Sequence, residues 1–292
     1  MNFQLYNESN SKPTVNTENN IGQNTVVPVE NANNEQTQTQ GSSTTDTNTY
    51  YYKQLSNTAK KIYDGLKKHK EDMKTGTYVI DFGTEFNSIL NEKDGEEILN
   101  QEYQSAWNAF SYDNVDLYYL DINKVSMVME ARTEGATTTY YVKIGPGDYS
   151  SYLSSTFANK KEIEDADAYI KDIRNQVMSI LGPYNNAMKI KVVNEWMIDN
   201  LSYENIEGNN NKYNLYGAIV ETKVVCEGYA RMFKYIMDGL NIPCILVSGT
   251  ATNSEGETEL HAWNYVELNG QWYAVDVTWN DPVVIGEGEL TE

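Results

Sequence analysis

The sequence predicts an α+β protein, and three observations support this class. Two long segments, residues 160–181 and 186–203, carry apolar side chains at helical spacing. Several shorter segments show the apolar or alternating pattern of strands. At 292 residues the chain is long enough to bury a sizeable core in one large domain or two smaller ones. Helical and strand segments in such a chain indicate mixed layers around a common core.

Residues 1–49 differ in composition from the rest of the chain. Asn, Thr, Gln and Ser dominate, and apolar residues do not cluster. Such a segment cannot bury enough apolar surface to offset the entropy lost on ordering, so we expect a disordered tail or spacer. A first helix is expected soon after residue 50, where apolar residues recur at helical spacing: Leu55, Ala59, Ile62, Tyr63 and Leu66.

Residues 50–150 are expected to form a smaller α+β lobe, whose role the sequence does not indicate. A helix-like stretch, residues 102–113, lies among segments typical of strands. The predicted strands are residues 76–83, 115–122, 124–132 and 137–145.

Residues 151–292 are expected to form a second domain that starts with the two long helices. The first of these should stop at Gly182 and Pro183. A later helix should begin around Cys226 and bury Tyr229 and Phe233 on one face. The segment "IPCILVSG" that follows is typical of a buried strand.

The last predicted element is a hairpin around Asn269-Gly270, a dipeptide favoured in two-residue turns. Such a turn pairs Leu268 with Gln271, so Trp263 should face Asp276 and His261 should face Thr278. Side chains alternate between the two faces of a strand, so these four should point to one side. His261 and Asp276 would then be diagonal neighbours on the order of 7 Å apart, close enough for an imidazole to meet a carboxylate.

Charge and composition exclude several classes of function. The net charge of −20 argues against a nucleic-acid partner and against an anionic membrane surface. No apolar run reaches the roughly 20 residues of a membrane span, and the start of the chain is unlike a signal peptide. We therefore expect no membrane insertion, while the spacer-like tail favours a secreted or cell-surface location.

A metal or other cofactor is not expected. The two cysteines and two histidines have no zinc-site spacing, and no calcium-binding loop motif is present. Two cysteines are also too few for a disulfide framework. His69 lies in the lysine-rich stretch "LKKHKEDM", which is typical of a solvated helix face without a chemical role.

Cys226 is the candidate nucleophile. A cysteine at a helix N-terminus beside an imidazole is favoured as the thiolate, and free backbone N–H groups there could hold an oxyanion. With His261 as base and Asp276 as the carboxylate that orients it, the three residues fit triad chemistry. Each has a structural alternative: a buried thiol, a core histidine or a turn-capping aspartate. Cys244, within an apolar strand, is expected to be an inert core residue.

The segments "VVCEGYARMFKYIMDGLNIPCILVSG" and "HAWNYVELNGQWYAVDVTWNDP" resemble the bacterial branch of the transglutaminase-like superfamily. The resemblance covers about residues 184–282. It implies a papain-like core, in which a helix bearing the cysteine at its N-terminus packs on an antiparallel sheet. It also implies a catalytic triad of Cys226, His261 and Asp276.

The chain departs from the family pattern in two respects. It stops soon after Pro282, where family members commonly continue into further strands, so the domain is a candidate for C-terminal truncation. A second oxyanion or substrate-binding group is not evident. The candidates are Tyr216 and Trp263, for which packing in an aromatic core is the alternative.

The resemblance implies acyl transfer or hydrolysis on protein or peptide amides through a thioester. Water as acceptor would make the protein a peptidase or amidase, and an amine would make it a crosslinking enzyme. The sequence does not select the acceptor. The alternative of a different class is a catalytically inactive papain-like module that binds or scaffolds at the cell surface.

Overall fold

The structure is a computed structural model, and it describes residues 49–252, 256 and 258–281. The tail predicted over residues 1–49 therefore lies, except for Thr49, outside the described residues. The end of the chain, where truncation is expected, also lies outside them. The described residues contain helices and antiparallel sheets, which confirms the α+β class.

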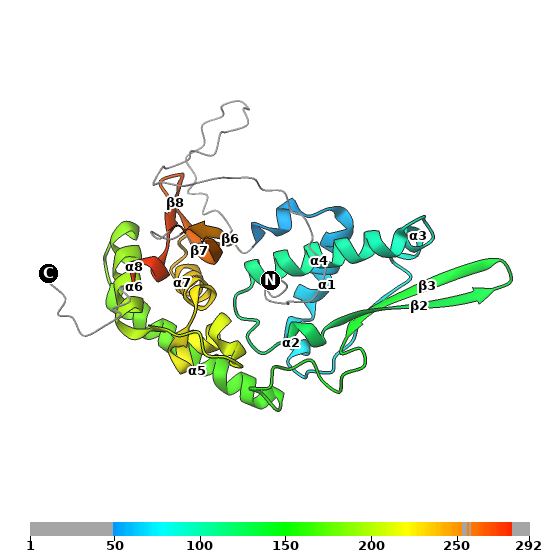
Figure 1. Ribbon diagram of the computed structural model, residues 1–292, viewed down its shortest axis with the longest axis horizontal. Coiled ribbons are helices and arrows are strands. Elements are labelled where there is room, and N and C mark those ends of the chain that lie inside the picture. The colour runs from blue at the N-terminus through cyan, green and yellow to red at the C-terminus, as the bar shows by residue number, and fades with distance from the viewer. Residues whose placement is uncertain (1–48, 253–255, 257, 282–292) are drawn as a thin grey trace, which may run out of the picture. The chain divides into compact units, whose positions relative to one another are not determined.

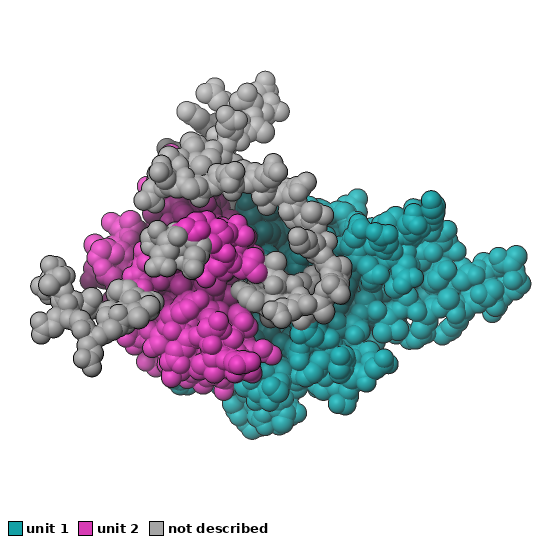
Figure 2. All heavy atoms as spheres, viewed as in Figure 1, with its two compact units in different colours: residues 1–4, 48–172 teal, residues 5–47, 173–292 magenta. Residues whose placement is uncertain are grey.

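The chain divides into two compact units, and Figure 2 shows them in different colours. Among the described residues, unit 1 holds 49–172 and unit 2 holds 173–281. The division falls inside one continuous helix, α5 (Lys160–Leu181), whereas the sequence placed a border near residue 150. The sequence pattern changes to that of long helices where α5 begins. The residues of α5, however, pack with unit 1 as far as Asp172 and with unit 2 only after it. The assignment of residues 50–150 and 151–292 as separate domains stays a prediction.

Unit 1 combines helices with a three-stranded antiparallel sheet in the order β1-β3-β2 (Figure 1). Its elements before α5 are η3 (Tyr52–Gln54), α1 (Asn57–Lys68), α2 (Lys70–Met73), β1 (Ile80–Gly83), α3 (Asn87–Leu90), α4 (Gly95–Asp113), η4 (Ile122–Lys124), β2 (Ser126–Glu134) and β3 (Thr137–Gly145).

The core of unit 1 lies between α1 and α4. Ser56 caps α1 by accepting a hydrogen bond from the Ala59 N–H, which satisfies one of the free donors at the helix start. The Tyr63 ring meets the Phe110 ring of α4 edge to face, with centroids 5.4 Å apart. The predicted apolar face of α1 is confirmed, since four of its members are fully buried: Ala59, Ile62, Tyr63 and Leu66.

The strand predicted over residues 115–122 is wrong. This segment is a series of turns with one isolated bridge, between Leu120 and Leu153. Tyr118, Tyr119 and Leu120 are all buried in succession, whereas a strand would turn alternate side chains to opposite faces. Apolar and aromatic content alone therefore suggested a strand where the chain instead folds inward.

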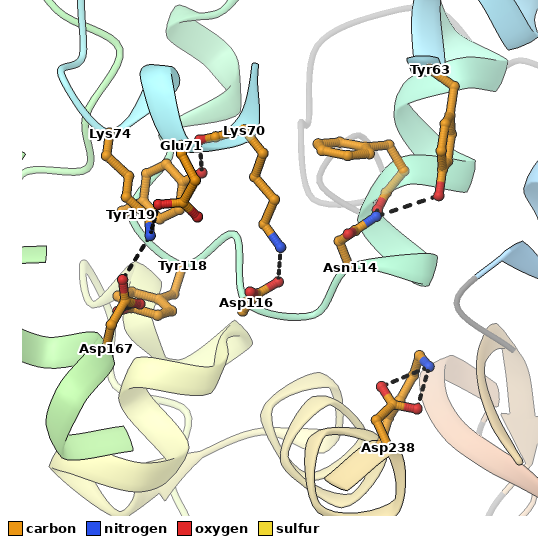
Figure 3. A network of polar contacts seen from close by, with 12 residues as sticks. Tyr63, Lys70, Glu71, Lys74, Asn114, Asp116, Tyr118, Tyr119, Asp167 and Asp238 are labelled. Atoms are coloured by element: carbon orange, nitrogen blue, oxygen red, sulfur yellow. Dashed lines mark hydrogen bonds and ion pairs between the residues drawn. The ribbon is translucent and has the colours of Figure 1, made fainter. Parts of the chain in front are cut away.

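A polar network holds this turn segment to the helices of unit 1 (Figure 3). Lys74 Nζ forms ion pairs with Glu71 Oε2 at 2.7 Å and with Asp167 Oδ2 at 2.8 Å. The Tyr118 hydroxyl donates to the other oxygen of Asp167, at 2.5 Å. The Tyr119 hydroxyl donates to a backbone carbonyl of α2. The carboxylates of Glu71 and Asp167 therefore have structural partners: both pair with the Lys74 ammonium, and Asp167 also accepts from the Tyr118 phenol.

Unit 2 contains two pieces of sheet and the central helix α7 (Figure 1). After α5 its elements are α6 (Asn186–Asn200), β4 (Ser202–Tyr203), η5 (Asn210–Tyr213), the π-helix η6 (Gly217–Glu221), β5 (Lys223–Val224), α7 (Cys226–Gly239), β6 (Cys244–Thr252), β7 (Thr258–Leu268), β8 (Gln271–Val275) and α8 (Val277–Asn280).

Helix α7 packs against β6 and β7 of the antiparallel sheet β6-β7-β8. Its buried face includes Tyr229, Phe233 and Met237, as its apolar spacing predicts. Asn264 of β7 donates from Nδ2 to the carbonyl of Ala230 in α7, at 3.0 Å. A helix bearing Cys226 at its N-terminus thus lies on an antiparallel sheet, as expected.

The predicted hairpin is right at its turn and wrong at its open end. Leu268 pairs with Gln271 around the predicted turn, but the ladder ends at the pair Asn264–Val275. The expected pairs Trp263–Asp276 and His261–Thr278 do not form. Asp276 instead caps α8: its Oδ1 accepts from the Trp279 N–H at 3.1 Å, which draws the chain out of the sheet into a short helix.

Candidate active site

Cys226 is the first residue of α7, and its side chain is buried. The preceding Val225 is extended, and its N–H donates to the Lys212 carbonyl of η5 at 3.0 Å. This close approach explains Gly228: a Cβ there would lie 2.8 Å from the Lys212 carbonyl oxygen and 2.5 Å from the Val224 side chain. The glycine therefore allows the η5 segment to fix the start of the helix.

The backbone N–H of Cys226 points out of the first turn, where the helix provides no acceptor. Within the described part of the chain, that N–H has no hydrogen-bond partner. A helix N-terminus also carries partial positive charge. The position can therefore stabilise a negative oxygen that develops beside the Cys226 sulfur.

His261 lies on β7, opposite Gly249 of β6, and is buried. Its Nε2 is 2.6 Å from Asp276 Oδ2. The Cys226 side chain is close enough to the imidazole to help raise its pKa. Because Nε2 is engaged by Asp276, the nitrogen available to Cys226 is Nδ1. The imidazole therefore has the carboxylate as its bonded partner and the thiol as a neighbour.

The surroundings of His261 change its protonation. Burial alone lowers the pKa of the imidazole, but hydrogen bonds with Asp276 and Cys226 and the negative charges of both outweigh burial and raise the pKa to about 9. The ring is therefore mainly protonated at neutral pH.

Asp276 has two structural tasks because each carboxylate oxygen has its own partner. Oδ2 meets His261, while Oδ1 caps α8. The segment after the cap is tied to the rest of unit 2, since Asn280 bonds Asn194 of α6 and the Tyr229 hydroxyl donates to Asp281 at 2.5 Å. The predicted contact between Asp276 and His261 thus forms through a helix cap and not through a strand pair.

Two tryptophans stack on the imidazole. The Trp263 ring lies 5.8 Å from it at an interplanar angle of 19°, and the Trp279 ring lies 5.0 Å from it at 23°. Trp279 is 53% exposed, so much of its surface faces solvent. Trp263 therefore stacks directly on the His261 ring, and its role as an oxyanion or substrate group stays a prediction. Tyr216 is the residue just before η6, and its predicted role also remains untested.

Two phenols near the thiol were not predicted. Burial and the charges of Cys226 and Glu259 raise the pKa of Tyr203 to about 12. Burial, then the charges of Glu227 and Cys226, raise the pKa of Tyr213. Tyr203 reaches this place because β4 pairs in parallel with β5, which matches Tyr203 with Val224. Its only sequence signal is an aromatic residue in the short stretch "LSY", which does not reveal a two-residue parallel pairing.

Cys244 has the environment expected of an inert core thiol. It is completely buried on β6, and burial raises the pKa of its thiol well above the ordinary range, although Lys234 opposes the shift. Lys234 donates to the Cys244 carbonyl at 3.1 Å. The two cysteines of the chain therefore differ sharply in surroundings.

Metal and membrane sites can be surveyed over the described residues. No group of three or more His, Cys, Asp or Glu side chains there could hold a metal ion. In the same part of the chain, no helix combines the length and apolarity required to cross a membrane.

Comparisons with known proteins agree with the predicted family. Residues 174–277 match the model of the transglutaminase-like superfamily. The kyphoscoliosis peptidases of Mus musculus and Homo sapiens are each 25% identical to the chain over 157 residues. That match covers 48% of this chain and only 23% of each relative's length.

Solved structures give weaker matches. One is a crystal structure titled as a TGase, with a TM-score of 0.36, 14% identity and coverage of 59% of this chain and 48% of that one. Another is the periplasmic domain of TgpA from Pseudomonas aeruginosa bound to ethylmercury, with a TM-score of 0.30, 13% identity and coverage of 54% and 66%. The family assignment comes from the matched segment, which includes Cys226, His261 and Asp276: residues 174–277 form a transglutaminase-like domain.

Proposed function

We propose that the protein catalyses cysteine-dependent acyl transfer or hydrolysis on peptide or protein amides. The observation that carries the proposal is the position of His261, which bonds Asp276 through Nε2 and has the Cys226 side chain as a neighbour that helps to raise its pKa. Nucleophile, base and orienting carboxylate are the three parts that such chemistry requires.

In the first half-reaction the Cys226 thiolate attacks the carbonyl carbon of an amide. A C–S bond forms, negative charge moves to the carbonyl oxygen, and the Cys226 N–H donates to that oxygen. The C–N bond then breaks while the protonated His261 gives its proton to the leaving nitrogen. The products are a free amine, an acyl thioester on Cys226 and a neutral imidazole.

In the second half-reaction a water or amine attacks the thioester carbon, and His261 takes a proton from the attacking group. The C–S bond breaks and Cys226 leaves as the thiolate, which restores the imidazolium pair. Water gives hydrolysis, and a primary amine gives a new amide bond. Asp276 holds His261 in the orientation and protonation that both steps need.

The comparisons support the class of reaction without fixing the substrate. The matched curated relatives are named as peptidases, and this chain covers a small part of their length. The peptide substrate and the choice between water and amine are therefore parts of the proposal. An inactive binding or scaffolding module is the rival, and it predicts that no covalent intermediate forms.

The test is mass spectrometry of a peptide library incubated with the protein, with and without a primary amine. We expect peptides that gain water or exchange an amine, together with an acyl adduct on Cys226 in quenched samples. Labelling by iodoacetamide at neutral pH should be at least about 100-fold faster at Cys226 than at Cys244, because a thiolate paired with an imidazolium reacts and a buried thiol does not. Equal labelling in the folded protein, with no adduct, would favour the inactive module.

A further inference from the structure

The two edges of the unit 1 sheet differ in length and regularity. The β1 edge is only four residues long, and its register with β3 shifts between Asp81 and Gly83. The β2 edge is nine residues long and pairs with β3 without a break. Proteins usually protect such edges with prolines, bulges or charged side chains, especially lysine; β2, "SMVMEARTE", has no Pro, Lys or bulge, and its charged side chains are of both signs. In Figure 1, β2 and β3 form a long hairpin that extends past the helices of unit 1.

The turn of the hairpin decides which backbone groups of β2 are free to pair. Glu134 pairs with Thr137 around a two-residue loop, and Gly135 has a φ of 61° as such turns require. The residues that close a two-residue turn bond each other, so Glu134 and every second residue before it direct their N–H and C=O toward β3. The residues that direct these groups away from the sheet are Met127, Met129, Ala131 and Thr133.

The side chains beside this edge carry both signs of charge. Glu130 and Arg132 lie on one face of β2, with side chains 44% and 65% exposed. Glu130 forms an ion pair with Lys143 at 3.2 Å, and the Arg132 guanidinium lies 4.4 Å from the Tyr141 ring centre. Across a free edge, opposite charges in facing positions attract and like charges repel.

We infer that the β2 edge pairs antiparallel with the β2 edge of a second copy of this chain, in a register centred on Ala131. In this register, the residues whose N–H and C=O groups point away from β3 face the same kind of residue on the partner subunit, so that these groups can bond each other. Glu130 then lies opposite Arg132 of the partner subunit, and the two-fold symmetry produces this pair twice. Centring on Glu130 or on Arg132 would set like charges face to face. Centring on Met129 would place Glu130 opposite a valine. Centring on Thr133 would place Arg132 opposite Glu134, but only residues 132–134 of the two strands would overlap, against 128–134 in the register centred on Ala131. The charges and the length of the overlap together therefore favour the register centred on Ala131.

The net charge of −20 on each copy opposes this association over long distances. At 0.15 M salt, repulsion between exposed charges is screened beyond about 8 Å, whereas facing side chains lie closer than that. The dimer should therefore form weakly, depend on protein concentration, and be favoured by moderate rather than very low salt. The inference concerns unit 1 alone and does not depend on the activity proposed for unit 2.

Sedimentation velocity over a range of protein concentrations in 0.15 M salt tests the pairing. Glu130→Arg and Arg132→Glu should each weaken self-association by at least about tenfold, because each replaces two attractive pairs with two repulsive pairs. The double variant Glu130→Arg/Arg132→Glu should restore the association to within a few-fold of the parent. Glu85→Arg is the matched control, because Glu85 is an exposed unit 1 carboxylate paired with Lys61 and the change alters net charge equally. It should leave association unchanged.

Ala131→Pro provides a second test that does not involve charge. The N–H of Ala131 faces away from β3, so proline removes a donor from the edge while leaving the ladder inside the chain. Circular dichroism and the melting temperature should stay near the parent values while the dimer is lost. A parent that is monomeric at every concentration would overturn the inference. Single variants that dimerise like the parent, or a double variant that is not restored, would overturn it equally.

Discussion

The molecule contains two histidine–aspartate pairs, one in each unit, and their contact geometry is similar. His69 Nδ1 lies 2.9 Å from Asp72 Oδ2 in unit 1, and His261 Nε2 lies 2.6 Å from Asp276 Oδ2 in unit 2. Each imidazole also stacks on an aromatic ring. His69 lies 4.9 Å from the Tyr78 ring, and the nearer of the two tryptophan rings on His261 lies 5.0 Å away. A contact between His and Asp, even with an aromatic neighbour, therefore does not distinguish a site from a surface pair.

The two pairs differ in burial and in the third partner. The side chains of His69 and Asp72 are 21% and 51% exposed, while those of His261 and Asp276 are 4% and 22% exposed. Only the unit 2 imidazole has a cysteine among the groups that raise its pKa, which reaches about 9. Charged hydrogen bonds are stronger where water is excluded. The burial and the sulfur together make the second pair a candidate for catalysis.

The largest contrast between the pairs should appear when each histidine is removed. His261→Ala should lower turnover of the peptides found by mass spectrometry by up to about 10⁶-fold, since the thiolate loses its proton partner. His69→Ala should leave turnover within about twofold, because the His69 ring is partly solvated and has no nucleophile. The readout is the initial rate at saturating peptide. Parent-like turnover in His261→Ala would mean that the chemistry does not pass through this pair, and a comparable loss in His69→Ala would mean that the loss does not distinguish the two pairs.

Replacing each aspartate by asparagine sharpens the comparison. Asp276→Asn should reduce kcat by about 10⁴-fold, because an amide no longer holds the imidazole in the required protonation and tautomer. Asparagine is also a good helix cap, so α8 should remain and circular dichroism should stay near native. Asp72→Asn is the matched control and should have almost no effect on kcat. Parent-like kcat in Asp276→Asn would show that another group orients His261.

The raised pKa of His261 also predicts how stability depends on pH. Because its pKa is about 9 in the folded protein and 6.5 as the ordinary value, the folded state binds this proton more tightly. The stabilisation is complete below pH 6.5 and is lost as pH rises through about 9. It amounts to at most about 3 kcal/mol. Urea unfolding at pH 6 and pH 10 should show this loss in the parent.

Variants of the pair provide the control for that measurement. In Asp276→Asn the difference in unfolding free energy between pH 6 and pH 10 should shrink, because the charge that holds the proton is gone. In Asp72→Asn it should stay as in the parent. A parent whose stability is constant or increases over this interval would contradict the raised pKa of His261.

The local signals in the sequence predicted the elements that carry the site. Residues 160–181 form one helix as their periodicity predicts, and α7 begins at Cys226. The Asn269-Gly270 turn fixed the pairing of Leu268 with Gln271. These predictions succeed because apolar spacing and turn chemistry act over a few neighbouring residues. The same local pattern brought His261 and Asp276 to one end of the hairpin.

Most features that the sequence did not predict depend on contacts between distant segments, and one depends on a local helix cap. The ladder ends at Val275 because the Asp276 side chain caps a helix, which competes with strand pairing. Tyr203 approaches Cys226 only through the parallel pair of β4 and β5. The segment 115–122 turns inward because its tyrosine rings are buried while their hydroxyls bond groups on α2 and α5. The last two contacts have no local signal, whereas the cap spans only three residues and corresponds to the turn-capping alternative for Asp276.

The smallest effect in the series should come from the exposed ring over the base. The Trp279 ring stacks on His261, while the Trp279 backbone N–H donates to Asp276 Oδ1 in the cap of α8. Trp279→Ala therefore removes the ring and keeps both the cap and the His–Asp bond. Such aromatic contacts contribute about 0.5–1.5 kcal/mol, so the rate of iodoacetamide labelling at Cys226 should fall by about 2- to 10-fold. Trp279→Phe should recover most of the rate.

Tyr273→Ala is the matched control for this measurement, because it removes an exposed aromatic ring from β8 of the same sheet and should have no effect. If Trp279→Ala labels as fast as Tyr273→Ala, burial by the sheet and the bond to Asp276 are enough to hold the imidazole, and the difference between the two histidines does not involve the exposed ring.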